Sequence, residues 1–434
     1  MRDSDKSFKF DRVSVDDVDV EIETKPSRTD RTKLPNLMTP QWLKRRHICF
    51  LAYICWAVMT SILALKIHEI TSALASQKEP TKLEILFKKK TLHALCYATS
   101  WQENLYLNCT NLIGNTRGKG GRGLGLANVR NDIVTCLRMA IDAGIGFIMP
   151  KVAVRSEENP LDFDQWADLS YVIDEENLIE IMQRECPQLN VLPNNAVFNN
   201  TILTQTKAEK DIYYCTYTIG RYYDYLKDIL TPHGINLSSN IDYPSVVWEH
   251  EVIFRWNFST ENHQIHTSLM NAVKYAPKLL TLGQSITEKI KVDYLGFHLR
   301  AEADALWYNY TTQVEKLMDI IQSSKVNIKT IYVAVGNLSL YSDFTTDMSR
   351  YGLTVLSKWS IASDYDEILT ELNQLKFDQL AVVDYHILLN STYFVGLGMS
   401  SYSFAIAYDR GHGDIAQCNC SLEGPIEKLF DPCY

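Results

Sequence analysis

The sequence predicts an α/β protein with a parallel sheet in its C-terminal half, anchored by one helix near its N-terminus. Two observations carry this prediction. Strand-like and helix-like segments alternate between residues 294 and 408, and residues 48–65 contain no charged side chain. Such alternation is typical of a parallel sheet covered by helices. With 46% hydrophobic and 22% charged residues, the composition is that of a globular protein.

The uncharged run at residues 48–65 is long enough to span a thin bilayer as a helix of roughly 27 Å. A signal peptide fits less well because 47 residues precede the run, and a buried core helix usually shows a polar stripe. Residues 44–46 are Lys or Arg, so the positive-inside rule places the N-terminus in the cytosol. We therefore expect a disordered cytosolic tail over 1–47, a transmembrane helix over 48–65 and a stem over 66–95.

Two patterns beyond residue 65 fit a lumenal location. Eight cysteines lie there, an even count typical of disulfides in an oxidising compartment, although eight cysteines allow 105 pairings. Eight N-x-[ST] sequons also lie there and none precedes residue 48. The cysteines are Cys96, Cys109, Cys136, Cys186, Cys215, Cys418, Cys420 and Cys433. The candidate glycosylation sites are Asn108, Asn199, Asn236, Asn257, Asn309, Asn337, Asn390 and Asn419. The sequence predicts a single-pass protein of the Golgi or endoplasmic reticulum membrane.

The sequence gives little support for nucleic acid or for a metal ion as a partner. The net charge is −9, which disfavours nucleic acid as the main partner. Asp162 and Asp164 match the D-x-D pattern of metal-dependent glycosyltransferases, but three-residue matches are common and residues 160–174 resemble a surface loop. We expect no resident metal or cofactor.

A glycine-rich segment opens the clearest helix of the N-terminal half. Five glycines lie between residues 118 and 125, Asn128 is suited to cap a helix, and an apolar stripe runs from there to Gly144. Residues 145–149 read as a short buried strand. Backbone N–H groups at such a helix start favour an anion, although a glycine loop alone is a weak signal.

In the C-terminal half, polar motifs follow two of the predicted strands. The strands are expected at residues 294–298, 330–335, 354–356 and 393–395, and the helices at 311–321, 339–350, 364–375 and 402–408. Ligands of parallel sheets sit beyond the carboxyl ends of the strands. His298, Arg300, Glu302 and Asp304 follow the first of these strands, and the 400–403 motif Ser-Ser-Tyr-Ser follows the last.

These motifs are suited to a nucleotide diphosphate. Arg300 offers a planar cation for one phosphate, and the serine hydroxyls with a helix N-terminus suit a second. Such groups stabilise a departing diphosphate without a divalent metal. The alternative role of Arg300 is an ion pair with Glu302 or Asp304.

Taken in order, the motifs resemble those of the GDP-fucose protein O-fucosyltransferase family. The similar segments are residues 123–132 with 147–150, 296–304, 331–336 and 384–403, which together span about residues 118–410. The resemblance implies a GT-B fold, in which two Rossmann-like domains face each other across a cleft. Here these would be an acceptor-side domain over 96–285 and a nucleotide-sugar-binding domain over 286–434.

The same resemblance implies an inverting, metal-independent transfer of fucose from GDP-fucose to a hydroxyl of a protein or glycan. Another GDP-sugar as donor stays open at this point. The resemblance also implies that Arg300 binds the β-phosphate of the donor. The residues implied at the nucleotide-sugar site are Asn128, Arg130, His298, Arg300, Asp384, Ser400, Ser401 and Tyr402.

The general base stays open at this point. Some relatives carry a Glu where this sequence has Gly125, and the candidates here are Asp132 and Glu302. The same glycine motivates an alternative, a catalytically degenerate GT-B-like module that binds a glycan or a protein in the lumen.

Overall fold

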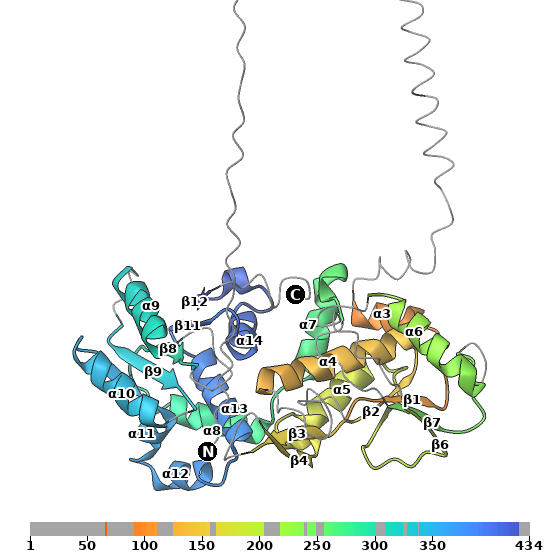
Figure 1. The fold of residues 1–434 in the computed structure, drawn as a ribbon, viewed down its shortest axis with the longest axis horizontal. Coiled ribbons are helices and arrows are strands. Elements are labelled where there is room, and N and C mark those ends of the chain that lie inside the picture. Colours follow the sequence, from red (N-terminus) through yellow and green to blue (C-terminus); the bar gives the residue numbers. More distant parts are fainter. Residues whose placement is uncertain are drawn as a thin grey trace, which may run out of the picture. The chain divides into compact units, whose positions relative to one another are not determined.

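The computed structural model describes residue 66 and residues 91–110, 125–156, 162–203, 218–237, 241–248, 256–300, 309–323, 328–336 and 338–424. The chain divides into two units between Lys78 and Glu79, and the elements below all belong to the second unit (Figure 1).

The first half of this unit is built on a parallel sheet. Within the described residues its five strands have the order β5-β2-β1-β7-β6. The strands are β1 (Leu105–Asn108), β2 (Gly146–Ile148), β5 (Val191–Leu192), β6 (Asn200–Leu203) and β7 (Ser245–Trp248). The helices are α3 (Leu92–Ala98), α4 (Leu126–Ala143), α5 (Glu175–Glu185), α6 (Arg221–Leu230) and α7 (His263–Ala272), with 3₁₀ turns η1 (Leu169–Tyr171), η2 (Thr231–His233) and η3 (Phe258–Thr260).

A second parallel sheet forms the other half, and α8 (Pro277–Thr287) leads into it. Its described strands have the order β10-β9-β8-β11-β12. They are β8 (Leu295–His298), β9 (Thr330–Ala334), β10 (Thr354–Leu356), β11 (Tyr393–Leu397) and β12 (Cys420–Glu423). The helices are α9 (Tyr310–Ser323), α10 (Leu338–Ser349), α11 (Lys358–Ala362), α12 (Asp366–Leu372), α13 (Phe377–Leu389) and α14 (Ser401–Arg410), followed by the turn η4 (Ile415–Gln417).

The α/β prediction is confirmed, and every strand expected between residues 294 and 395 is present. The two parallel sheets agree with the predicted GT-B class. The expected helix at 364–375 is present as the shorter α12, and a separate helix, α11, which the sequence did not indicate, ends before it at Ala362. The boundaries at residues 95 and 285 stay predictions.

Helix α4 begins earlier than the sequence suggested. Gly125 is its N-cap residue, and Asn128 lies inside the first turn, so the prediction that Asn128 caps the helix is wrong. The other end is as expected: Gly144 adopts φ 65°, and its N–H bonds the carbonyls of Ala140 and Ile141. A glycine meets this left-handed conformation without a steric cost.

The segment 160–174 is not simply a surface loop. Strand β4 (Phe163–Ala167) pairs antiparallel with β3 (Val152–Arg155), and η1 follows it. This hairpin contacts the second half of the unit. Arg155 Nε donates to Asp378 Oδ1 on α13 at 2.7 Å, and its guanidinium lies 4.6 Å from the Phe377 ring.

A buried cation joins helices from the two halves. Arg130 on α4 forms an ion pair of 2.6 Å with Asp409 on α14, and its side chain is 5% exposed. Its other nitrogens donate to the carbonyls of Val273 (2.8 Å) and Met270 (3.0 Å), at the end of α7. Burial alone would lower the pKa of Arg130, but Asp409 raises it above the ordinary value, so the side chain stays cationic. Figure 1 accordingly shows α4 beside α14.

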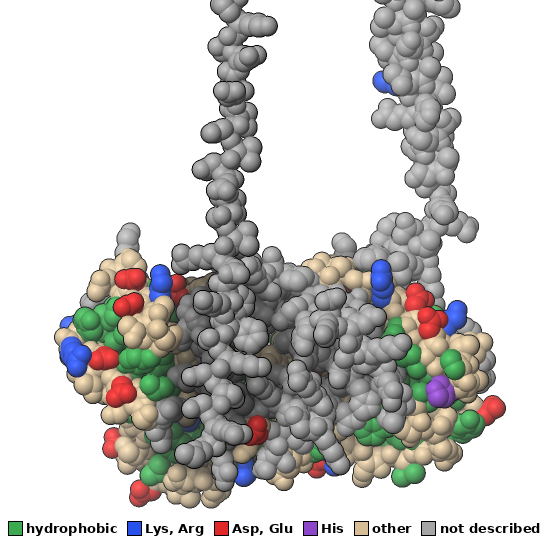
Figure 2. Space-filling model, in the orientation of Figure 1, with side chains coloured by type: hydrophobic (Ala, Val, Ile, Leu, Met, Phe, Trp, Pro, Cys, Tyr) green, Lys and Arg blue, Asp and Glu red, His purple; other side chains and the backbone are tan. Residues whose placement is uncertain are grey.

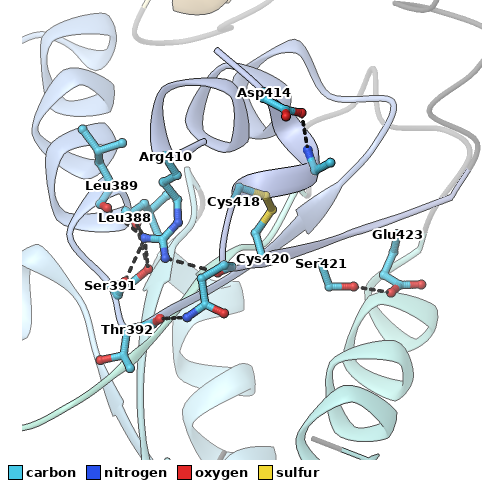
Figure 3. Close-up of a disulfide and its surroundings, with 12 residues drawn as sticks. Leu388, Leu389, Ser391, Thr392, Arg410, Asp414, Cys418, Cys420, Ser421 and Glu423 are labelled. Carbon is cyan, nitrogen blue, oxygen red and sulfur yellow. Dashed lines mark hydrogen bonds between the residues drawn. A yellow bond between two sulfur atoms is a disulfide. The ribbon is translucent and has the colours of Figure 1, made fainter. Parts of the chain in front are cut away.

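Arg410 fixes the edge of the second sheet (Figure 3). Its guanidinium donates to the carbonyls of Leu389 (2.8 Å) and Ser391 (2.8 Å) before β11 and to that of Asn419 (3.1 Å) before β12. The disulfide Cys418–Cys420 closes the same turn. Two further disulfides, Cys96–Cys186 and Cys109–Cys136, lie in the first half. The prediction of disulfides is therefore confirmed for six cysteines.

The membrane prediction falls outside the described residues. Of the helices that the structure describes, none combines the length and the apolar character needed to cross a bilayer, and residues 48–65 are not among them.

Among the sequons, Asn199, Asn236, Asn309, Asn390 and Asn419 are exposed and Asn257 is half-buried, whereas Asn337 lies outside the described residues. Asn108 differs, since it is 3% exposed inside β1 and its Oδ1 accepts from Thr110 N. This burial argues against a glycan on Asn108 in the folded chain.

Asp409→Asn should destabilise the folded chain by about 3 kcal/mol, because it leaves Arg130 buried without its counter-charge. The urea unfolding midpoint measures the effect. The matched control is Arg184→Ala, which removes an exposed pair with Glu180 and should cost under about 0.5 kcal/mol. Equal, small losses in both variants would contradict a structural role for the buried pair.

Candidate active site

The order of the second sheet defines where a ligand is expected. Numbered along the chain, its strands run 3-2-1-4-5, so the winding direction reverses between β8 and β11. These two strands are adjacent and parallel, and their carboxyl ends lie together. In open α/β sheets, the crevice at such a reversal is where ligands bind. The residues that follow β8 and β11 are therefore the first candidates.

Arg300 and Ser400 meet at this point. Arg300 follows β8 by two residues, Ser400 is the N-cap residue of α14 after β11, and Arg300 Nη1 donates to Ser400 Oγ at 3.3 Å. Gln313 on α9 holds the backbone of Arg300 from both sides. Arg300 N donates to Gln313 Oε1 (3.0 Å), and Gln313 Nε2 donates to Arg300 O (2.6 Å).

Gln313 is a positioning residue that sequence reasoning missed. It is 3% exposed on a helix whose buried residues also include Leu317. A buried amide is costly unless both its ends are bonded, and Arg300 supplies both partners. The available signal was a glutamine on the apolar stripe of a predicted helix.

His298 anchors the start of α14 to the end of β8. Its Nδ1 lies 2.7 Å from Ser403 Oγ, and the same hydroxyl accepts from Leu397 N at 3.2 Å. Burial, with a smaller contribution from Arg300, lowers the pKa of His298 to about 3. The imidazole is therefore neutral at physiological pH.

The close approach of α14 to β11 depends on Gly396. A Cβ atom there would lie 2.5 Å from Ser403 Oγ and 2.7 Å from Ser403 Cβ. Any side chain would push the first turn of α14 away from the strand. The N-terminus of the helix would then move relative to Arg300.

Tyr402 lies between this site and α13. Its ring centroid is 4.8 Å from that of His298 and 5.9 Å from that of Tyr385, and its hydroxyl donates to Ala381 O. Ser401, the first residue of α14, is half-buried beside it. The structure thus gathers five predicted residues at the ends of β8 and β11: His298, Arg300, Ser400, Ser401 and Tyr402.

Asp384 and Arg130 have protein partners instead. Asp384 is 7% exposed, and its two oxygens accept from Tyr332 and Lys358, each at 2.6 Å. Burial raises the pKa of the Tyr332 hydroxyl well above its usual value, and the neighbouring Asp384 raises it further. Each nitrogen of Arg130 contacts a protein acceptor in the network described above. This geometry gives no support to either residue as a nucleotide ligand.

Besides Arg130, helix α4 carries the predicted residues Asn128 and Asp132, and their surroundings differ. Asn128 is half-buried, and its Oδ1 is shielded from solvent without a hydrogen-bond partner among the described residues. It lies in the first turn of α4, where the glycine-rich segment ends. Asp132, one turn later, is 1% exposed. Glu302 and residues 111–124 lie outside the described part of the chain.

A metal centre finds no support in the described residues, which contain no cluster of three or more His, Cys, Asp or Glu suited to hold an ion. Asp162 is exposed immediately before β4, and Asp164 lies within that strand. On the described part of the face in Figure 2, acidic and basic side chains are interspersed.

The sequence profile of the GDP-fucose protein O-fucosyltransferase family matches residues 122–412, about two thirds of the chain. The chain belongs to this family. The match runs from α4 to the end of α14, so it includes the Arg300–Ser400 pair and the described strands other than β1 and β12. The protein is accordingly a glycosyltransferase of the O-fucosyltransferase type.

Comparison with solved structures gives weaker likenesses. POFUT1 in complex with GDP-fucose is 10% identical with a TM-score of 0.45, covering 74% of this chain and 99% of that one. Fucosyltransferase NodZ from Bradyrhizobium is 9% identical with a TM-score of 0.39, covering 70% of this chain and 93% of that one. No curated protein matches the chain.

The neutral state of His298 predicts acid sensitivity. The unfolded chain binds a proton on this imidazole below pH 6.5, whereas the folded chain does not until about pH 3. The contribution of the neutral His298 to the free energy of unfolding is complete above pH 6.5 and is lost as the pH falls toward 3. The free energy of unfolding changes by up to about 1.4 kcal/mol per pH unit in this range.

His298→Asn should therefore flatten the dependence of unfolding free energy on pH between 6.5 and 4, as measured by urea titrations at each pH. His233→Ala serves as the control, because His233 is exposed. An unchanged slope in the His298 variant would show that the imidazole is not held neutral.

Proposed function

We propose that the protein transfers fucose from GDP-fucose to a hydroxyl of a protein or glycan, with inversion at the anomeric carbon and without a divalent metal. The observation that carries the proposal is the Arg300–Ser400 pair at the point where the second sheet reverses its winding. Family membership supports the chemistry, and solved structures include POFUT1 in complex with GDP-fucose and NodZ soaked with GDP-fucose.

The diphosphate is expected between the end of β8 and the start of α14. Arg300 provides a fixed positive charge there, and the first-turn N–H groups of α14 point to the same place. Arg300 and the start of α14 are held in place before the donor binds. Gln313 hydrogen-bonds the backbone of Arg300, and His298 hydrogen-bonds Ser403 in the first turn of α14. Such preorganised groups stabilise charge as it develops on a leaving group.

The transfer itself is a single displacement. The acceptor oxygen bonds to the anomeric carbon as the bond from that carbon to the β-phosphate oxygen breaks, and GDP departs with the electron pair. The proton of the acceptor hydroxyl passes to a carboxylate. Arg300 then balances the negative charge that GDP gains as it departs. In metal-dependent enzymes a divalent metal ion has this role.

Glu302 is the stronger candidate for this carboxylate. It follows Arg300 by two residues in the chain, whereas Asp132 is 1% exposed on α4.

The cellular setting forms part of the same proposal. A membrane anchor at residues 48–65 would place the enzyme in the Golgi or endoplasmic reticulum with its catalytic part in the lumen. The three disulfides support an oxidising compartment.

Arg300→Ala should weaken GDP binding by about 10- to 100-fold, the effect of losing a charge-assisted hydrogen bond worth about 1.5–3 kcal/mol. Titration calorimetry of the full-length chain measures this, and Arg300→Lys should restore part of the affinity. Arg350→Ala is the control, because that arginine is 70% exposed on the surface. Unchanged GDP affinity in Arg300→Ala would refute the proposed site.

Two variants test which carboxylate is the general base, because loss of the base should slow transfer without weakening GDP binding. Glu302→Gln should keep GDP affinity and slow transfer by about 10²- to 10⁴-fold, the usual contribution of a general base. Asp132→Asn should leave transfer unchanged. Release of GDP from GDP-fucose in the presence of acceptor measures the rate, and the reverse pattern would assign the base to Asp132.

A further inference from the structure

A cavity lies beside α14, and neither Arg300 nor Ser400 is among its lining residues. Its volume is about 770 Å³, within the range typical of small-molecule sites. One wall comes from η3 and α7 of the first half of the unit. The other comes from α14 and the loop and turn that follow it. The lining residues include Phe258, His266, Phe404, Tyr408, His412 and Gln417.

Aromatic and imidazole rings form a continuous row along this cavity. The ring centroids of Phe258 and His266 are 4.3 Å apart, those of His266 and Tyr408 are 5.3 Å apart, and those of His263 and Tyr408 are 6.4 Å apart. The row crosses from η3 through α7 to α14. It offers flat, weakly polar surfaces rather than a uniform aliphatic wall.

Most of the titratable groups that line the cavity already have hydrogen-bond partners. Glu261 forms an ion pair with Arg138, and both side chains are fully buried. The two oxygens of Asp414 accept from Ala416 N (3.0 Å) and from Gln417 Nε2 (2.9 Å). Burial, with smaller contributions from His263 and Arg130, lowers the pKa of His266 to about 3, so that ring is uncharged. The walls therefore favour a neutral ligand over an ionic one.

The rim carries neutral hydrogen-bonding groups. Ser259, His412 and Gln417 are exposed lining residues, and they offer a hydroxyl, an imidazole and an amide. Ser259 Oγ already donates to Asn257 Oδ1 and Gln417 Nε2 to Asp414 Oδ2, so an aliphatic ligand would only cover polar groups that a ligand hydroxyl can also bond. A sugar matches both parts of the cavity, since the C–H face of its ring packs against aromatic rings and its hydroxyls pair with neutral polar groups.

The loop that closes the cavity is held in an unusual conformation. His412 adopts φ 52°, a left-handed value that is strained for a non-glycine residue. Next to it, the carbonyl of Gly413 lies 2.7 Å from His263 Nε2 on α7. This contact fixes the loop against the opposite wall, and the strained residue His412 is among those that line the cavity.

Helix α14 connects this cavity to the proposed donor site. Phe404 and Tyr408 lie one and two turns after Ser400, about 6 Å and 12 Å along the helix at 1.5 Å per residue. A ligand in the cavity thus lies within the length of a short oligosaccharide from the diphosphate site.

We propose that this cavity binds a neutral oligosaccharide and that this glycan is the acceptor of the transferred sugar. The binding part stands on the cavity alone, whereas the acceptor part rests on the proposed function.

The test measures oligosaccharide binding to the full-length chain by titration calorimetry, without a donor. The probes are neutral tetrasaccharides of mannose, glucose, galactose and N-acetylglucosamine, with tetragalacturonate as the charged comparator and octanol as the aliphatic one. At least one neutral tetrasaccharide should bind with a Kd below about 1 mM. Binding of octanol or tetragalacturonate with no binding of any neutral tetrasaccharide would overturn the proposal.

Two variants localise the binding. His412→Gly should weaken oligosaccharide binding by about 10-fold while leaving the thermal midpoint equal or higher, because glycine relieves the left-handed strain. Phe258→Leu should also weaken it, since the ring is lost but apolar volume is kept. His233→Ala, an exposed histidine outside the cavity, should change nothing. Unchanged oligosaccharide affinity in both cavity variants would overturn the proposal.

Two further readouts separate the cavity from the donor site. GDP affinity should be the same in His412→Gly as in the parent chain, and the tetrasaccharide that binds best should become fucosylated when GDP-fucose is supplied. Variant-sensitive glycan binding in a chain that does not bind GDP would refute the proposed function and the acceptor role, but not the glycan site. GDP binding with no glycan binding would refute only the cavity proposal.

Discussion

The placement of one arginine at the carboxyl end of β8 is the constraint on which the rest of the site depends. Arg300 is held on its backbone by Gln313 and contacts Ser400 through its guanidinium. It lies where the sheet order 3-2-1-4-5 reverses, so β8 and β11 bring a cation and a helix N-terminus together without a long loop. A donor diphosphate placed there meets charge that is positioned before binding.

The other buried charges serve the fold. Arg130 joins α4 to α14 through Asp409, and Arg155 joins the β3–β4 hairpin to α13 through Asp378. A buried charge without a partner is strongly destabilising, so each of these cations is matched by an acid from the other half of the unit. The two sheets are thereby held in a fixed relation around the helices α13 and α14, which position the candidate site.

Local patterns in the sequence predicted the strands β8 to β11 and the helices α9, α10, α12 and α14, because each has a clear period and boundary signals, whereas α11 and β12 were not predicted. Ser400 and Arg300 were found because they directly follow strands. The partners of Arg130 and Asp384 were not, since Asp409 is 279 residues from Arg130 and no local pattern reports such a contact. Gly125 is the N-cap residue of α4 although it has no side chain to accept a capping hydrogen bond, so the general preference for Asn at this position did not locate the start of the helix.

Hydrogen–deuterium exchange of the full-length chain with and without saturating GDP tests the central claim most directly. The account predicts slower exchange in peptides that cover residues 297–300 and 397–404, where the end of β8 and the first turn of α14 meet. The peptide over residues 268–275, whose carbonyls hold Arg130, should not change. Protection confined to the first sheet, or none near Arg300 and Ser400, would contradict the account.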